Sequence, residues 1–402
     1  MSDIKRFMDT RDAKIIKAYY VLMWILFVII FIADIIVGVK YYRLGEHIDI
    51  PFPLTFIIYT IITTPLASFL GVSLATIISG IGSRTSFLQA GIIAYINDGV
   101  KKRIRLNPNF LSILGFRVVA HSFNVYDDAS FITERKVLVR YYLWLLIIYP
   151  ILGVIFAVLK LFFGGGLLGE ILNMLTIACG VWTIFEASPY GKLESNAKNY
   201  LRAKFDDLYI IANLTDTLLF ATKYKFDPEP VRAYKINGIC RELANPAVDP
   251  NAKLSSITVE SVFGDYISQG RTDFPKIIAD YFEYYIANSE RIFAGKNCTL
   301  NCGLWECALY YLALTGRREA AVNDYNKRAT YMIAPGKASR YINGSLRYQL
   351  FNEDYSVWLF DRKNMYPSAH GNFIVKWFEI PYLFETTFHT KLHELIWEKQ
   401  GS

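Results

Sequence analysis

The sequence has few of the residues, and none of the motifs, that identify a catalytic centre. Histidine and cysteine each occur only five times among 402 residues. No Gly-x-Ser-x-Gly elbow is present, and Gly336-Lys337-Ala338-Ser339 lacks the preceding glycine and the Lys-Ser/Thr junction of a phosphate-binding loop. The acidic pairs Asp127-Asp128 and Asp206-Asp207 lack the further ligands that a magnesium-dependent diphosphate enzyme requires. The sequence therefore indicates no particular reaction.

The cysteines form no strong metal-binding or disulfide pattern. Cys298, Cys302 and Cys307 have the spacing C-x3-C-x4-C, whereas structural zinc sites use closely spaced pairs with two further ligands. Cys240 is distant in the sequence, and Cys179 falls inside a long apolar run. We interpret these thiols as ordinary reduced side chains and predict no disulfide.

Positive charge is not concentrated in the large C-terminal part of the chain. Residues 1–185 contain 17 Lys/Arg and 11 Asp/Glu, whereas residues 186–402 contain 26 and 25. Most of the formal excess of +7 therefore lies in the first part. A nucleic-acid-binding domain needs a concentrated basic face, so this distribution argues against nucleic acid as a partner.

Long apolar runs, in contrast, are abundant and predict a membrane region. Hydrophobic residues make up 53% of the chain, and its mean hydropathy is +0.24. Four runs approach the roughly 20 residues that a helix needs to cross the hydrocarbon core, at residues 18–39, 54–82, 141–163 and 167–185. Such runs must be helical, because lipid offers no partner for peptide N–H and C=O groups. The shorter run Phe87–Ile96 is expected to extend the second helix or to lie in the membrane interface.

The distribution of Lys and Arg predicts the orientation of these four helices. Successive water-facing segments hold five, two, nine, none and four Lys/Arg residues. Since positive charge marks cytoplasmic segments, the alternation predicts a multi-pass protein of the cell membrane with both termini in the cytoplasm. The loop at residues 97–135 is then cytoplasmic. Its residues Lys101, Lys102, Arg103 and Arg105 are predicted to lie against anionic lipid headgroups.

The second span carries a line of small residues that predicts close helix packing. Ala67, Gly71, Ala75 and Ser79 recur at four-residue intervals, so they share one face of the helix. We call this set the small-residue seam. It is predicted to pack inside the four-helix bundle or to join two protomers.

Beyond residue 185 the pattern changes to helical periodicity, which predicts an all-α cytoplasmic domain over residues 186–402. Apolar residues at three- and four-residue steps predict a single helix within Leu193–Tyr224. Helix starts, stops and periodic runs predict further helices, at residues 228–243, 275–292, 304–314, 317–331 and 381–399. The predicted fold class is thus all-α throughout, a four-helix transmembrane region followed by a helical domain.

The most specific chemical pattern is a set of three potential metal ligands on the last predicted helix. Glu385, His389 and His393 are four residues apart, so they would lie on one face, and His-x3-His is a chelating geometry for zinc. The full H-E-x-x-H pattern is absent, because Trp397 stands where the second histidine is required. The alternative interpretation is a partly buried stripe beside Phe388 and Trp397. No other metal or cofactor is expected.

One combination of features resembles a known family. The N-terminal spans, the helical C-terminal part and the hairpin at Ala308–Arg328 are similar to the DotM/IcmP-type subunit of type IVB secretion coupling complexes. The segment Trp358-Leu359-Phe360-Asp361-Arg362 matches the tryptophan-and-DR motif of that family in part. The resemblance covers a fraction of the chain and implies no site residue. No function is carried over from it, and a secretion or conjugation complex is one example of a membrane assembly that the chain could belong to.

Three functions are compatible with these patterns. The first is a scaffold or interaction subunit of a membrane complex, with a protein partner or a second copy of the chain. Its supports are the near-neutral helical domain, the many aromatic residues and the missing catalytic motif. The second is a membrane-surface enzyme that acts on a lipid or peptide through the face of His389 and His393. The third is an oligomeric channel or carrier, which depends on Asp34, a carboxylate within the first span.

The charge alternation makes a direct prediction about topology. Reporter fusions after Lys17, Glu46, Ala120, Gly165 and Leu300 are expected to report inside, outside, inside, outside and inside, because Lys/Arg-rich segments stay in the cytoplasm. An external signal at Leu300 would contradict the cytoplasmic placement of the C-terminal domain.

Overall fold

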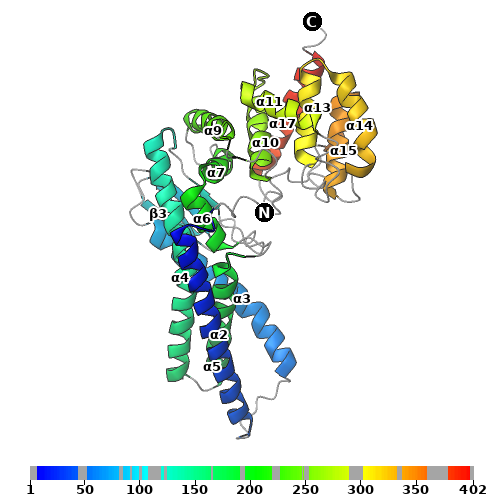
Figure 1. Ribbon diagram of the computed structural model, residues 1–402. Helices are drawn as coiled ribbons and strands as arrows, with labels where there is room; N and C mark the ends of the chain where they lie inside the picture. Colours follow the sequence, from blue (N-terminus) through cyan, green and yellow to red (C-terminus); the bar gives the residue numbers. More distant parts are fainter. Residues whose placement is uncertain are drawn as a thin grey trace. The chain divides into compact units, whose positions relative to one another are not determined.

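The computed structural model describes most of the chain (Figure 1). The described residues are 7–43, 52–80, 85–90, 93–98, 102–106, 119–121, 125–163, 166–190, 195–219, 227–246, 248, 253–288, 302–332, 337–359 and 379–398. The chain forms two compact units, Met1–Ile210 and Ile211–Ser402. The structure is predominantly α-helical, as the sequence predicts.

Unit 1 is built on four long helices. These are α2 (Arg11–Arg43), α3 (Phe52–Gly80), α4 (Asp128–Phe163) and α5 (Gly166–Ala187). Among the described residues, three stretches are long and apolar enough to cross a membrane, at Arg11–Ile32, Asp128–Phe163 and Leu168–Ala187. The predicted association with a membrane is supported by these three helices. The described apolar part of α3 is shorter.

A small antiparallel sheet lies between α3 and α4 in the sequence. Its strands are β1 (Thr85–Ala90), β2 (Ile93–Asp98), β3 (Lys102–Leu106) and β4 (Val119–His121), in the order β3-β2-β1-β4. This is a departure from the all-α prediction for this loop. The run Phe87–Ile96 forms most of the β1–β2 hairpin instead of extending α3. Short apolar runs do not distinguish helix from strand, and the antiparallel pairing of β1 with β2 and β4, and of β2 with β3, decided this one.

The four predicted headgroup-binding residues fall on or beside this sheet. Lys102, Arg103 and Arg105 belong to β3, which pairs with β2 and lies at one end of the strand order. Lys101 and the side chains of the other three lie outside the described part of the structure. Their contact with lipid therefore stays a prediction.

The small-residue seam of α3 packs inside unit 1. Ala67 and Ala75 are fully buried in a cluster that includes Tyr141 and Tyr149 of α4. A Cβ atom at Gly71 would overlap the ring of Tyr149, so glycine is required for this approach. The structure thus places the seam against a neighbouring helix of the same chain.

The prediction of a single helix within Leu193–Tyr224 is wrong, because the helix is interrupted at Asp206. It forms α6 (Asn196–Phe205) and α7 (Asp207–Leu219), and Asp206 between them has extended backbone angles. Helix α6 packs on α2, α4 and α5, with Leu201 buried in their shared core. For this reason the division between the two units falls after Ile210, later than the boundary at residue 185 taken from hydropathy.

Unit 2 is helical throughout its described residues. Its elements are α9 (Pro228–Leu243), α10 (Lys253–Ser268), α11 (Lys276–Ala287), α13 (Cys302–Leu314), α14 (Arg318–Met332), α15 (Lys337–Phe351), α16 (Ser356–Leu359), α17 (Glu379–His393) and the π-helix η4 (Glu394–Glu398). The predicted start of α9 is confirmed, since the Asp227 carboxylate accepts the Glu229 N–H at 3.1 Å. The predicted stop of α13 is also confirmed, because Gly316 has a φ of 80°.

Aromatic side chains and a hydrogen bond across a helical hairpin hold unit 2 together. The Phe282 ring lies 5.6 Å from that of Phe263 and 5.1 Å from that of Tyr311, which joins α10, α11 and α13. The predicted hairpin of α13 and α14 is present, and the Trp305 indole donates to the Asp324 carboxylate at 2.8 Å across it. These contacts place α13 at the centre of the unit.

The fit of Gly71 against Tyr149 leads to a prediction for stability. Gly71→Leu is expected to lower the free energy of unfolding by about 1–3 kcal/mol, because a side chain there forces two packed helices apart. Thermal unfolding of the full chain in detergent measures the change.

The control for this experiment is Val154→Leu, also a substitution to leucine in unit 1. Val154 is 64% exposed on α4, so the variant is expected to stay within about 0.5 kcal/mol of the original protein. Equal stability of the two variants would show that close contact between the small-residue seam and α4 does not contribute to the stability of unit 1.

Candidate functional site

His389 lies among buried polar side chains of α15 and α17. Its Nε2 atom is 3.0 Å from the Tyr341 hydroxyl, and its Nδ1 atom is 3.4 Å from the Ser345 hydroxyl. The Gln349 side-chain amide donates to the backbone carbonyl of His389 at 2.9 Å. Tyr341, Ser345 and Gln349 are four residues apart on α15, so they share the face that α17 covers. The helical spacing thus surrounds one imidazole with three polar groups.

Burial decides the charge of this imidazole. His389 is 2% exposed, and desolvation lowers its pKa to about 3. A buried cation would need a paired acid, whereas the hydroxyl and amide groups around His389 suit a neutral ring. The side chain is therefore neutral at physiological pH, and its two ring nitrogens face protein groups.

The same hydrogen-bond chain continues into α13. The Tyr310 hydroxyl lies 2.5 Å from the Ser345 hydroxyl and donates to the Glu306 carboxylate at 2.6 Å. Burial first, and the Glu306 charge second, raise the pKa of Tyr310 well above its usual value. We call Glu306, Tyr310, Tyr341, Ser345, Gln349 and His389 the His389 network. It joins three helices of unit 2.

A buried carboxyl group of α10 is influenced by this network. The Oε2 atom of Glu260 is buried and has no hydrogen-bond partner in the described part of the chain. Burial, and then the charge of Glu306, raise the pKa of Glu260 to about 8. Glu260 consequently holds its proton more tightly than an exposed glutamate does, chiefly because burial disfavours its charged form.

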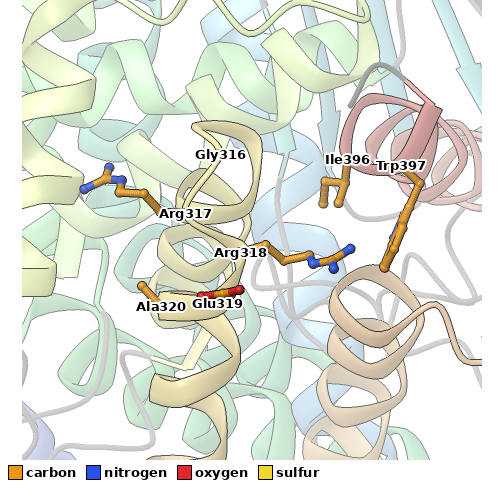
Figure 2. A pocket seen from close by; sticks show the side chains of 7 residues that line it. All are labelled: Gly316, Arg317, Arg318, Glu319, Ala320, Ile396 and Trp397. Carbon is orange, nitrogen blue, oxygen red and sulfur yellow. The ribbon is translucent and has the colours of Figure 1, made fainter. Parts of the chain in front are cut away.

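An open pocket of about 630 Å³ lies between the turn that joins α13 to α14, the first residues of α14, and η4 (Figure 2). It is lined by Gly316, Arg317, Arg318, Glu319, Ala320, Ile396 and Trp397. The Arg318 side chain reaches toward Trp397, and its guanidinium carbon lies 4.1 Å from the ring centre. A guanidinium over an indole face is a cation–π contact, which holds the Arg318 side chain in place. We call this site the Arg318–Trp397 pocket.

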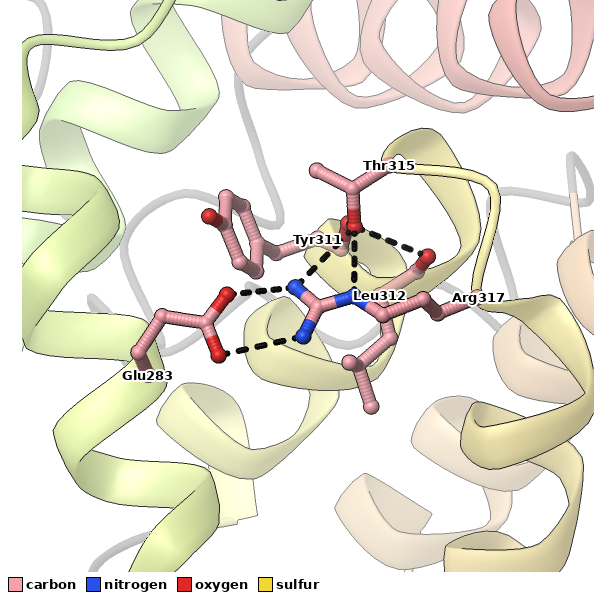
Figure 3. A network of polar contacts seen from close by, with 5 residues as sticks. All are labelled: Glu283, Tyr311, Leu312, Thr315 and Arg317. Carbon is pink, nitrogen blue, oxygen red and sulfur yellow. Dashed lines mark hydrogen bonds and ion pairs between the residues drawn. The ribbon is translucent and has the colours of Figure 1, made fainter.

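The two neighbouring arginines have different roles. Arg317 forms two parallel hydrogen bonds to the Glu283 carboxylate of α11, at 2.5 and 3.1 Å, and also donates to the Thr315 hydroxyl (Figure 3). This fork ties α11 to the turn before α14. Arg318 has no ion pair or hydrogen bond within the part of the chain that the structure describes.

Trp397 connects the pocket to the His389 network. Its indole N–H donates to the backbone carbonyl of Gln349 at 2.8 Å, while the Gln349 side chain donates to His389. Trp397 also lies in η4, and π-helical turns are frequent at functional sites. One face of the ring is thus presented to Arg318 by a fixed hydrogen bond at its edge.

The structure describes the side chains of two of the three residues predicted to bind metal. Both contact α15, His389 through Tyr341 and His393 through Tyr348, whose ring it stacks on with centroids 4.3 Å apart. The side chain of Glu385 lies outside the described residues. Among the side chains that are described, no group of three His, Cys, Asp or Glu residues could hold a metal ion. The metal site stays a prediction, and no described contact supports it.

Sequence reasoning missed most of the residues that form this site. Helices α10 and α15 were not predicted, so Tyr341, Ser345 and Gln349 were not recognised as a set. Their four-residue spacing beside buried Leu346 and Leu350 was the available signal. Comparisons with known proteins add nothing to the site, since no family model, curated protein or solved structure matches the chain.

The neutral state of His389 predicts how stability depends on pH. Because the folded-state pKa lies below the unfolded value of 6.5, its contribution to stability is complete above pH 6.5 and is lost as pH falls toward 3. His389→Gln removes this titration. The difference in unfolding free energy between the original protein and the variant is expected to shrink by about 1 kcal/mol per pH unit between about pH 6 and 4.

Leu346→Ala serves as the control, since Leu346 is fully buried on α15, the helix that contacts His389, and does not titrate. It is expected to lower stability by a similar amount at every pH. Parallel profiles for the original protein and His389→Gln would contradict a neutral, buried His389.

Elemental analysis of the same full-length samples tests the metal hypothesis, which requires bound zinc that His389→Gln removes.

Proposed function

We propose that the chain is a multi-pass membrane protein whose helical unit 2 is an interaction subunit of a membrane complex. Three apolar helices support the membrane part, and α3 serves as the fourth span, buried along its seam against α4. The Lys/Arg alternation supports cytoplasmic termini. Unit 2 then faces the cytoplasm.

The observation that carries the proposal is the Arg318–Trp397 pocket. Arginine and tryptophan are the residue types most enriched among those that dominate binding energy at protein interfaces. Here they are already stacked on each other, so little side-chain entropy is lost when a partner binds. The donor groups of Arg318 remain available to a carbonyl or carboxylate oxygen of the partner.

A local conflict in the sequence supports the same site. Arg317 and Arg318 precede or begin α14, where the helix dipole disfavours a cation by roughly 0.3–1 kcal/mol. The carboxylate of Glu283 offsets this cost for Arg317. For Arg318 the acidic residue in the first turn is its neighbour Glu319, which lines the same pocket but forms no ion pair with it in the described part of the chain. A cation at a helix end that disfavours its charge is a local conflict of the kind expected mainly at functional sites.

The enzyme hypothesis has less support from the geometry. It depends on a reactive face of His389 and His393, but His389 is buried and both of its ring nitrogens face protein groups. The channel hypothesis depends on Asp34, whose side chain lies outside the described residues. A protein partner, in a secretion or conjugation complex or another membrane assembly, fits the pocket better than either.

The proposal predicts that partner recovery depends on Arg318. Tagged full-length protein is purified from native membranes in mild detergent, and co-purifying proteins are quantified by mass spectrometry. Arg318→Ala is expected to reduce a specific partner by about tenfold or more, the loss typical of a dominant interface arginine.

Arg340→Ala is the matched control, because Arg340 is an exposed arginine of α15 outside the pocket. It is expected to leave recovery unchanged. A second copy of this chain as the recovered protein would identify a homo-oligomer. Equal recovery of all co-purifying proteins with Arg318→Ala and Arg340→Ala would overturn the pocket as the interaction site.

A further inference from the structure

Trp397 forms one wall of the Arg318–Trp397 pocket, and the helix that carries it is not an ordinary α-helix. Glu394–Glu398 form a π-helical turn directly after α17. An extra residue in a turn redirects the side chains that follow it, so the direction of Trp397 does not follow from that of His393 by α-helical geometry. The direction of the ring must be fixed by contacts with other elements.

The end of α15 provides the contact that fixes the ring. Helix α15 ends at Phe351, and Asn352 follows with a positive φ of 57°. The last four carbonyls of a helix have no partner within it, and the carbonyl of Gln349 is one of them. The Trp397 indole N–H donates a hydrogen bond to this carbonyl at 2.8 Å. One hydrogen bond therefore satisfies a helix end and orients a pocket wall.

The side chain of Gln349 is itself fixed by α17. Its Nε2 atom donates to the His389 backbone carbonyl at 2.9 Å, and Gln349 is fully buried. The His389 ring is in turn held by Tyr341 and Ser345, also of α15. These hydrogen bonds connect α15 to α17, the helix that continues into η4. A shift of one helix along the other would break them.

From these contacts we infer that Gln349 and His389 are positioning residues for the Arg318–Trp397 pocket. They hold the end of α15 at the place where its carbonyl receives the Trp397 indole, and Arg318 then stacks on the exposed ring face. Neither residue lines the pocket. The positioning of the ring follows from these contacts alone. Its consequence, the binding of a partner, rests on the proposed function.

The test uses the full-length protein in detergent, with the seven tryptophans labelled with ¹⁵N. The indole signal of Trp397 is identified as the one missing from Trp397→Phe. Gln349→Met keeps the length of the side chain and removes its hydrogen-bond donor. It is expected to speed the hydrogen exchange of the Trp397 indole by about tenfold or more, the change that corresponds to loss of a typical hydrogen bond.

Gln269→Met is the matched control, since Gln269 of unit 2 also donates through Nε2 to a backbone carbonyl, that of Asp265 at 2.9 Å. It is expected to leave the exchange of the Trp397 indole unchanged. Tyr341→Phe is a second variant for the case that Gln349→Met does not fold. It removes the hydroxyl next to His389 Nε2 and is expected to speed the same exchange to a smaller extent.

Partner recovery separates positioning from general loss of structure. Gln349→Met is expected to reduce recovery as Arg318→Ala does, and to cause no further reduction when combined with Trp397→Phe, because both changes act through one ring. Unchanged exchange of the Trp397 indole, or reductions that add in the double variant, would overturn the inference. Faster exchange together with full recovery in Gln349→Met and Arg318→Ala would support the positioning geometry and reject the proposed function.

Discussion

The arrangement of unit 2 depends on one requirement, that the buried polar groups around His389 find partners. An imidazole, an amide and two phenolic hydroxyls in a helical core lose their water, and each must be hydrogen-bonded to be tolerated. Tyr310, Tyr341, Ser345 and Gln349 satisfy this requirement together with His389. Apolar packing allows helices to slide by small amounts, but such directional bonds allow one register. The network therefore specifies how α13, α15 and α17 meet.

Unit 1 reaches a defined packing by a different route. Three of its helices are long and apolar enough to cross a membrane, where hydrophobic contact between helices contributes little and close fit between surfaces must hold them together. The overlap that any side chain at Gly71 would make with Tyr149 shows how close this fit is. Small residues fix the position of α3 against α4, as hydrogen bonds fix the helices of unit 2 against one another.

The chemistry of unit 2 divides between a closed interior and an open surface. His389 is buried, which keeps its ring neutral, and burial raises the pKa of Glu260 to about 8. Toward solvent lie the half-buried Arg318 and Trp397, stacked on each other. The hydrogen bonds of Gln349 to His389 and of Trp397 to Gln349 connect the buried network to the pocket.

Local rules let the sequence determine the apolar spans, the Asp227 cap of α9 and the stop at Gly316, because each depends on residues within a few positions. The sequence also identified His389 as unusual, although not for its actual contacts. The strands between Thr85 and His121, the break at Asp206 and the partners of His389 were decided by tertiary structure. Contacts between groups far apart in the chain contribute to each, such as the pairing of β1 with β4 and the contact of Tyr341 with His389, whose positions differ by 48. Periodicity places a side chain on a face, but only folding determines what that face meets.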